Sequence, residues 1–165
     1  MKSGFVYLRP SRLVYVRASG PYQQTIPQAW ERLMGWLEKN GLHSPVGRGY
    51  GLMRDNPAVV TADKCRYDAC VDLHPFYEER AIRELGAQTL PGGSYIRQRV
   101  VGGYDELLGR LPTIHQTFEM PSSLVLDDRR PLVTIYLDDP QRFSRPEQRA
   151  DVCIPVSARS KREAA

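Results

Sequence analysis

The sequence predicts an α+β protein made by tandem duplication of a β-α-β-β module. It would form an antiparallel sheet with helices on one side and a cleft at the pseudo-twofold axis between the copies. Repeated residues carry this prediction. At a spacing of 83 positions, GLMRDNP at residues 51–57 matches TIYLDDP at residues 134–140. The same spacing relates Arg66 to Arg149, Asp68 to Asp151, and Cys70 to Cys153. A spacing of 82 relates Arg17 to Arg99, Gly20 to Gly102, and Tyr22 to Tyr104. Only a one-residue insertion or deletion separates the two sets, so chance is a poor explanation.

The chain is predicted to be a single domain over residues 1–165. Copy one covers about residues 5–73 and copy two about residues 87–157, with a connector between them. Residues 158–165 are expected to form a flexible tail. A chain of 165 residues is long enough to bury a core without disulfides or a structural metal.

In the first copy, runs of β-branched and aromatic residues predict four strands, at residues 5–8, 13–16, 51–54 and 67–73. The helix between them is predicted from an apolar stripe formed by Ala29, Trp30, Leu33 and Leu37. Pro27 would lie in the first turn of this helix and Gly41 would cap its C-terminal end.

In the second copy, the same signals predict strands at residues 94–101, 132–137 and 152–156. The helix of this copy would carry Leu108, Leu111, His115 and Phe118 on its apolar side. Pro112 is costly deep inside a helix, so we expect it in a first turn or at a kink.

The composition predicts a soluble globular protein, with 41% apolar and 25% charged residues. The net charge of +4 includes the basic tail SARSKR at residues 157–162 and no basic stripe, which argues against direct nucleic-acid binding. Three cysteines without a CxxC pair favour reduced, buried thiols in a cytoplasmic protein. The N-terminal residues lack a signal-peptide pattern, and no apolar run reaches 18 residues, so we expect no membrane span.

Motifs for common chemistry are missing from the sequence. The three histidines have no ligand-spaced neighbours, and there is neither a phosphate-binding loop nor a GxSxG nucleophile elbow, so we expect no metal and no cofactor. The glycines at 49, 51, 92, 93, 102 and 103 are predicted to form turns with positive φ. Asp68 and Asp151 are expected to pair with arginine or tie down loops. Cys70 and Cys153 are expected to pack.

A ligand site is predicted from side chains that would border the cleft. Strand alternation places Thr134 and Tyr136 on one face, and the repeat relates them to Gly51 and Met53, so these four residues would line up around the pseudo-twofold. Trp36 and Phe118, which match at a spacing of 82, lie beside the apolar stripes of the helices; they would border the cleft or simply pack in the core. The candidate ligand-binding set is Trp36, Gly51, Met53, Tyr104, Phe118, Thr134 and Tyr136.

Several segments together resemble the GyrI-like small-molecule-binding domain, over about residues 5–156. They are Gly20-Pro21-Tyr22, AWERL at 29–33, YGLMRDNP at 50–57, KCRYD at 64–68, TLPGGSY at 89–95 and IYLDDP at 135–140. The resemblance implies a paired module of the SHS2 type with a ligand cleft between the copies, where relatives bind hydrophobic and often cationic compounds. It also implies a buried glutamate at the position of Thr134, used to meet cations or assist hydrolysis. Thr134 offers only a neutral hydroxyl, so the sequence argues against an enzyme.

The sequence thus predicts a protein that binds a hydrophobic, drug-like small molecule, to sequester it or to sense it as an effector for a regulator. Two alternatives stay open: a hydrolase of a strained, cyclopropane-bearing electrophile, and an inhibitor protein that interacts with DNA gyrase. The predicted partners are the ligand and either gyrase or a regulator. Either a monomer or a dimer is compatible with the sequence.

Overall fold

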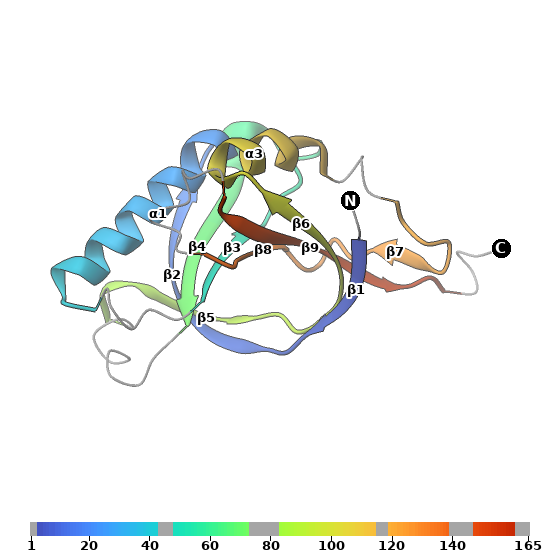
Figure 1. The fold of residues 1–165 in the computed structure, drawn as a ribbon, viewed down its shortest axis with the longest axis horizontal. Coiled ribbons are helices and arrows are strands. Elements are labelled where there is room, and N and C mark those ends of the chain that lie inside the picture. Colours follow the sequence, from blue (N-terminus) through green and yellow to red (C-terminus); the bar gives the residue numbers. More distant parts are fainter. Residues whose placement is uncertain (1–2, 43–47, 73–82, 115–118, 139–146, 161–165) are drawn as a thin grey trace.

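In the part of the chain that it describes, the computed structural model contains one antiparallel sheet with the helices α1 and α3 on one side of it (Figure 1). It describes residues 3–42, 48–72, 83–114, 119–138 and 147–160. In the first half of the chain, the elements are β1 (Ser3–Leu8), β2 (Ser11–Ser19), α1 (Tyr22–Lys39), β3 (Gly49–Met53), a 3-10 turn (Ala62–Lys64) and β4 (Arg66–Asp72). In the second half they are β5 (Gly86–Leu90), β6 (Gly93–Val101), α3 (Gly103–Arg110), a 3-10 turn (Leu111–Thr113), β7 (Leu124–Leu126), β8 (Leu132–Tyr136) and β9 (Arg149–Ala158).

The strands lie in the order β1-β6-β9-β8-β3-β4-β2-β5, and β7 pairs with the end of β9. The two halves use the same pairing register. Leu13 pairs with Asp72 between β2 and β4, and Tyr95 pairs with Pro155 between β6 and β9, at the spacings of 82 and 83 seen in the sequence. At the centre of the sheet β3 pairs with β8, and there Gly51 lies opposite Thr134. Because these two positions correspond in the two halves, a local twofold passes between them.

The first strand of each half pairs with the other half. β1 pairs with β6, and β5 pairs with β2. The chain therefore crosses twice between the two ends of the sheet, once from β1 to β2 and once from β5 to β6, and the sheet curls as Figure 1 shows. The sequence predicted a strand at residues 5–8, but neither its partner nor the strand β5.

Helix α1 follows the predicted apolar stripe but starts earlier than predicted. It begins at Tyr22, so Pro27 lies inside the helix and its prediction as a first-turn residue was wrong. The predicted cap at Gly41 is confirmed: its φ is +69°, its N–H donates to the Glu38 carbonyl, and the Leu42 N–H donates to the Leu37 carbonyl.

The second helix is short. α3 ends at Arg110, and Pro112 lies in the first turn of the 3-10 segment that follows, so a continuous helix does not run through the proline. Leu111 and Ile114 continue the apolar side into the core. His115 and Phe118, which the sequence placed on the same helix, lie outside the described residues.

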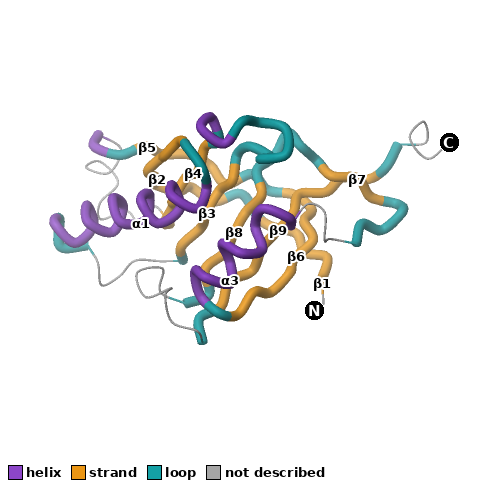
Figure 2. Tube along the Cα trace, turned by 90° about the horizontal axis from the view of Figure 1, so that it is seen from above, coloured by secondary structure: helices purple, strands orange, loops and turns teal. Residues whose placement is uncertain are grey.

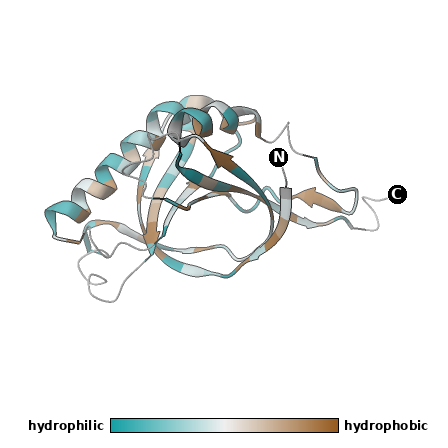
Figure 3. Ribbon diagram, viewed as in Figure 1, coloured by the Kyte–Doolittle hydropathy of each residue, from teal (hydrophilic) through white to brown (hydrophobic). Residues whose placement is uncertain are grey.

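Two hydrophobic cores lie on opposite faces of the sheet. The larger one fills the space between the sheet and the helices and contains residues of both halves, including Trp30, Leu33, Leu107 and Leu111. The other lies on the inner side of the curled sheet and contains Leu52 and Val133 among others. Figure 2 shows α1 and α3 covering the strands of the first and second half respectively, and Figure 3 shows hydrophilic and hydrophobic residues alternating along α1.

The glycine predictions were partly right. Gly93, Gly102 and Gly103 have positive φ, as predicted, and so does Gly20. Gly20 and Gly102 occupy matching turns. The Gly20 N–H donates to the Cys65 carbonyl just before β4, and the Gly102 N–H donates to the Gln148 carbonyl just before β9. Gly49, Gly51 and Gly92 do not have positive φ, so this part of the prediction was wrong for them. Gly49 and Gly51 lie within β3, whereas Gly92 does lie in the short connection between β5 and β6.

All three cysteines are free and buried in the structure, as the sequence predicted. Among the residues that the structure describes, no helix combines the length and the apolar character needed to cross a membrane.

A buried carboxylate in each half is held by arginines, which confirms the predicted pairing. The Arg17 guanidinium donates to both oxygens of Asp68, at 2.7 and 3.0 Å. Arg99 does the same to Asp151, at 2.8 and 3.1 Å. Asp68 also accepts hydrogen bonds from Arg54 and Gln88. Burial alone would raise the pKa of Asp68, but these hydrogen bonds outweigh burial and lower it below the ordinary value of 3.8.

Replacing Asp68 by Asn should lower the free energy of unfolding by about 2–4 kcal/mol, because it leaves buried donors facing a neutral group. The control is Asp151→Asn, with a smaller expected loss, because the two arginines around Asp151 are more exposed than Arg54. Since the folded-state pKa of Asp68 is depressed, its contribution is present above about pH 4 and is lost as the pH falls through that pKa. Urea unfolding at pH 7 and pH 3 measures both effects. Equal losses in the two variants, or a loss for Asp68→Asn that is the same at both pH values, would contradict this role of Asp68.

Candidate functional site

The four strand residues predicted to surround the pseudo-twofold lie on the two central strands, where Gly51 is opposite Thr134 and where Met53 and Tyr136 lie at opposite ends of the ladder. Gly51 and Met53 on β3 and Thr134 and Tyr136 on β8 share the face of the sheet that is turned toward the helices. All four are buried. Alternation along the strands places Val133 and Ile135 on the opposite face, in the inner core.

Three aromatic side chains meet above these residues and form a hydrogen-bonded group, which we call the aromatic cluster: Trp30, Tyr67 and Tyr136. The Trp30 indole N–H points to both phenol oxygens, at 2.9 Å from Tyr67 and 3.2 Å from Tyr136. The two phenol oxygens are 3.1 Å apart. Trp30 and Tyr136 pack edge to face, with ring centroids 5.0 Å apart. The aromatic cluster is therefore fixed both by packing and by polar contacts.

Gly51 makes room for this cluster. A Cβ atom at Gly51 would lie 2.1 Å from the Tyr67 phenol oxygen and 2.9 Å from its ring. No side chain fits at this distance, so glycine is required here by the close approach of Tyr67 and not by a turn.

The aromatic cluster presents neutral groups. Burial raises the pKa of Tyr136 to about 12, although its hydrogen bonds with Tyr67 and Trp30 act in the opposite direction. The phenol therefore stays protonated at physiological pH. Thr134 beside it adds a hydroxyl with no useful basicity.

A small apolar pocket opens next to the aromatic cluster. Its volume is about 170 Å³, and its lining comes from the start of α1, the turn after β3, the first 3-10 turn, and the α3 region: Pro21, Tyr22, Gln23, Pro57, Ala62, Leu108 and Leu111. Tyr22 connects pocket and cluster, because its ring packs edge to face against Tyr67 with centroids 6.4 Å apart. The Tyr22 hydroxyl is anchored by donating to the Asp55 carbonyl at 2.7 Å. The pocket thus receives residues from both halves of the chain.

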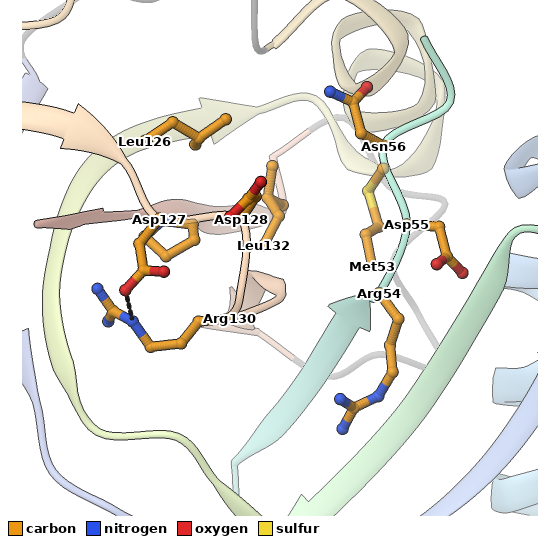
Figure 4. A pocket seen from close by; sticks show the side chains of 10 residues that line it. Met53, Arg54, Asp55, Asn56, Leu126, Asp127, Asp128, Arg130 and Leu132 are labelled. Carbon is orange, nitrogen blue, oxygen red and sulfur yellow. Dashed lines mark hydrogen bonds and ion pairs between the residues drawn. The ribbon is translucent and has the colours of Figure 1, made fainter. Parts of the chain in front are cut away.

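A second hollow, of about 60 Å³, is lined by Met53 at the end of β3, by the residues that follow it, and by residues around the β7–β8 connection, as Figure 4 shows. Its lining mixes charged and apolar residues, and the side chain of Asp127 is paired there with Arg130 at 3.0 Å. Arg130 also donates to the Ser94 and Val156 carbonyls. The ion pair therefore ties β6, β9 and the β7–β8 connection together, and we assign this hollow a structural role.

The other predicted site residues lie elsewhere or are not described. Trp36 is half-buried toward the C-terminal end of α1, where its N–H donates to Glu84 at 2.6 Å, and it does not line the apolar pocket. Tyr104 belongs to the first turn of α3, and its side chain is not described. Phe118 lies outside the described residues.

Sequence reasoning missed Trp30, Tyr67 and Tyr22 as site residues. Trp30 was assigned to the apolar stripe of its helix, and the stripe alone does not separate a core position from one above the centre of the sheet. A signal for Tyr67 was available, because a strand tyrosine diagonally opposite a strand glycine often covers it. Among the described residues, no group of three or more His, Cys, Asp or Glu is placed to hold a metal ion.

Comparison with known proteins identifies the family. The GyrI-like small molecule binding domain matches residues 1–157, nearly the whole chain. The chain belongs to the GyrI-like family. One relative, described as a DNA gyrase inhibitor from Serratia proteamaculans, is 36% identical over 86 residues, covering 51% of this chain and 54% of the relative. The chain spans about half the length of the first curated relatives that it matches.

Solved structures of low sequence identity share the fold of this GyrI-like chain. SAV2435 bound to tetraphenylphosphonium has a TM-score of 0.65 at 15% identity, covering 95% of this chain and 94% of that one. The EcmrR C-terminal domain has a TM-score of 0.66 at 13% identity, covering 94% and 97%. The curled antiparallel α+β architecture is therefore common to all three.

The close approach of Tyr67 to Gly51 makes a direct test of this GyrI-like site. Gly51→Ala should lower the free energy of unfolding by about 2–4 kcal/mol, because the buried ring cannot move away from the new methyl group. Gly35→Ala is the matched control: Gly35 is exposed on α1, and no atom lies within 4 Å of the place where its methyl group would be, so alanine should raise stability by about 1 kcal/mol. Thermal and urea unfolding measure both. Neutral behaviour of Gly51→Ala would show that Tyr67 is not held as described.

Proposed function

We propose that this GyrI-like chain binds a hydrophobic, uncharged small molecule between its two halves, against the aromatic cluster, and acts by sequestering it or by sensing it as an effector. The observation that carries the proposal is the apolar pocket, which draws Tyr22 and Ala62 from one half and Leu108 and Leu111 from the other. The pocket is lined by Tyr22, whose ring packs against Tyr67 of the aromatic cluster.

The size of the pocket requires the site to open. About 170 Å³ is smaller than the 300–1,000 Å³ of typical drug-sized sites. The buried rings of Trp30 and Tyr136, which contact each other and Tyr67, fill the adjoining space, so a ligand larger than a single ring system would have to move them. Their release exposes two phenols, an indole N–H and apolar ring faces, which suit a flat ligand with a neutral hydrogen-bonding group.

The chemistry of the aromatic cluster supports a neutral ligand. The SAV2435 structure contains tetraphenylphosphonium, a lipophilic cation. Here Thr134 provides no negative charge to balance a cation, and no base for hydrolysis, so binding of neutral compounds is favoured over both cation selection and catalysis.

We also infer that the two halves arose by tandem duplication. The equal registers of β2–β4 and β6–β9, and the matching pairs Arg17–Asp68 and Arg99–Asp151, support this origin. A ligand site at the local twofold would then combine equivalent positions that have diverged, such as Gly51 and Thr134.

Binding can be read from Trp30 alone. The chain has two tryptophans, so Trp36→Phe leaves Trp30 as the only one. Titration with a panel of neutral lipophilic dyes and drugs should give a saturable change in Trp30 emission for at least one compound. Adding Ala62→Phe, which fills the pocket, should weaken that binding at least tenfold, or about 1.4 kcal/mol. Ala58→Phe is the control, because Ala58 is exposed nearby and does not line the pocket. Equal affinities in both variants would remove the site assignment.

Restoring a carboxylate should change ligand preference. Thr134→Glu should bind tetraphenylphosphonium at least tenfold more tightly than Thr134→Gln at pH 8, because only glutamate supplies a charge. Burial raises the pKa of such a glutamate, so the advantage should fade as the pH drops toward 5 and the group protonates. Isothermal titration at the two pH values measures this. Equal binding by the Glu and Gln variants at pH 8 would place the ligand away from Thr134.

A second function, inhibition of DNA gyrase, is favoured by the description of the 36% identical relative. A supercoiling assay with purified gyrase separates the two proposals, because ligand sequestration alone leaves supercoiling unchanged. Inhibition that persists in the Ala62→Phe variant would indicate a surface distinct from the pocket.

A further inference from the structure

The edge strand β1 carries an exposed aromatic surface. Phe5 and Tyr7 are 63% and 68% exposed, and the strand ends the sheet, pairing only with β6 among the described strands. Figure 2 shows β1 at the outer margin of the sheet, beyond β6. Phe5 and Tyr7 share the face opposite to Val6 and Leu8, which pack against the inner core.

β1 lacks the features that usually protect an edge. The segment SGFVYL contains no charged residue and no proline. Its six residues pair regularly with β6, without a bulge. Natural sheets normally block exposed edges with lysine, proline, bulges or very short strands, because unpaired N–H and C=O groups recruit other strands. A free edge of this kind is therefore suited to pairing with another strand.

We propose that β1 pairs antiparallel with β1 of a second copy of this chain, so that the two sheets join edge to edge. This proposal is independent of the proposed ligand site, which lies on the helix-covered side of the central strands.

The sequence of β1 is self-complementary in one register. If Val6 lies opposite Val6 of the second copy, Phe5 lies opposite Tyr7 in both directions, and Gly4 lies opposite Leu8. All four exposed rings then form cross-strand aromatic pairs on one face, which are among the favourable pairs in antiparallel sheets. If Phe5 instead lies opposite Phe5 of the second copy, Tyr7 lies opposite Ser3 and has no aromatic partner. The first register also puts Arg9 opposite Ser3, so no like charges face each other.

The proposed contact would bury a small surface. Four partly covered rings amount to roughly 400 Å² of apolar surface, to which the strand backbones add. This is below the size of a permanent interface, so the contact should be reversible, with a dissociation constant in the range of about 10–100 µM.

Sedimentation velocity of the 165-residue chain, from about 1 to 500 µM, tests the proposal. The sedimentation coefficient of the wild type should rise from the monomer to the dimer value over this range. Tyr7→Lys should weaken association at least tenfold, since it puts a charge beside Phe5 of the second copy. Val59→Lys is the control: Val59 is 81% exposed and lies outside β1. Because Tyr7 is exposed, its replacement should leave the circular dichroism spectrum unchanged, and Phe5→Lys provides a second variant. A wild type that stays monomeric to 500 µM, or equal association by Tyr7→Lys and the control, would overturn the proposal.

Cysteine cross-linking tests the register. Under mild oxidation, Val6→Cys should form a covalent dimer faster than Phe5→Cys, because only position 6 faces itself across the proposed twofold. The native cysteines are buried and give the background rate. Faster cross-linking through position 5, or none above background at either position, would contradict this pairing.

Discussion

At the centre of the sheet, Gly51 of β3 lies opposite Thr134 of β8, and the Tyr67 ring occupies the space that a side chain at Gly51 would need. The Gly51–Thr134 pairing joins the two halves into one sheet. The position of the Tyr67 ring over Gly51 brings Tyr67 within hydrogen-bond distance of Tyr136 and Trp30. Through Trp30, helix α1 is thereby tied to β4 and to β8. A larger residue at 51 would displace Tyr67 and disturb sheet, helix and site together.

The polar groups of each half support this centre from the other face. Asp68 holds β2 through Arg17 and Asp151 holds β6 through Arg99, and Asp68 has two further partners, Arg54 and Gln88. Gln88 lies on β5, so this network also anchors the strand that crosses over from the second half. The halves are alike in register but not in chemistry, since Leu137 stands where Arg54 does in the first half.

Much of the fold could be predicted from repeated residues, because strand alternation and helical periodicity are local properties. The spacing of 83 related Gly51 to Thr134 and Met53 to Tyr136: Gly51 and Thr134 are paired in the sheet, whereas Met53 and Tyr136 lie at opposite ends of the β3–β8 ladder. The exchange of β1 and β5 between halves could not be predicted, because the partner of a strand is chosen by tertiary packing and leaves no mark in a six-residue segment. The role of Trp30 in the aromatic cluster was not predicted for a related reason, because its contact with Tyr67 depends on where α1 crosses the sheet. The start of α1 was predicted too late because Pro27 was taken as a first-turn residue, whereas it lies inside the helix, which begins at Tyr22.

We propose that the aromatic cluster closes a ligand site between the halves and opens when a neutral hydrophobic molecule enters. A crystal structure of the wild-type chain with such a molecule bound is the most direct measurement. We predict density for the ligand between α1 and α3, in contact with Thr134, with the Trp30 and Tyr136 rings moved apart and the Gly51–Thr134 pairing intact. A ligand bound elsewhere, with the Trp30 indole N–H still 2.9 Å from the Tyr67 oxygen as it is here, would contradict this claim.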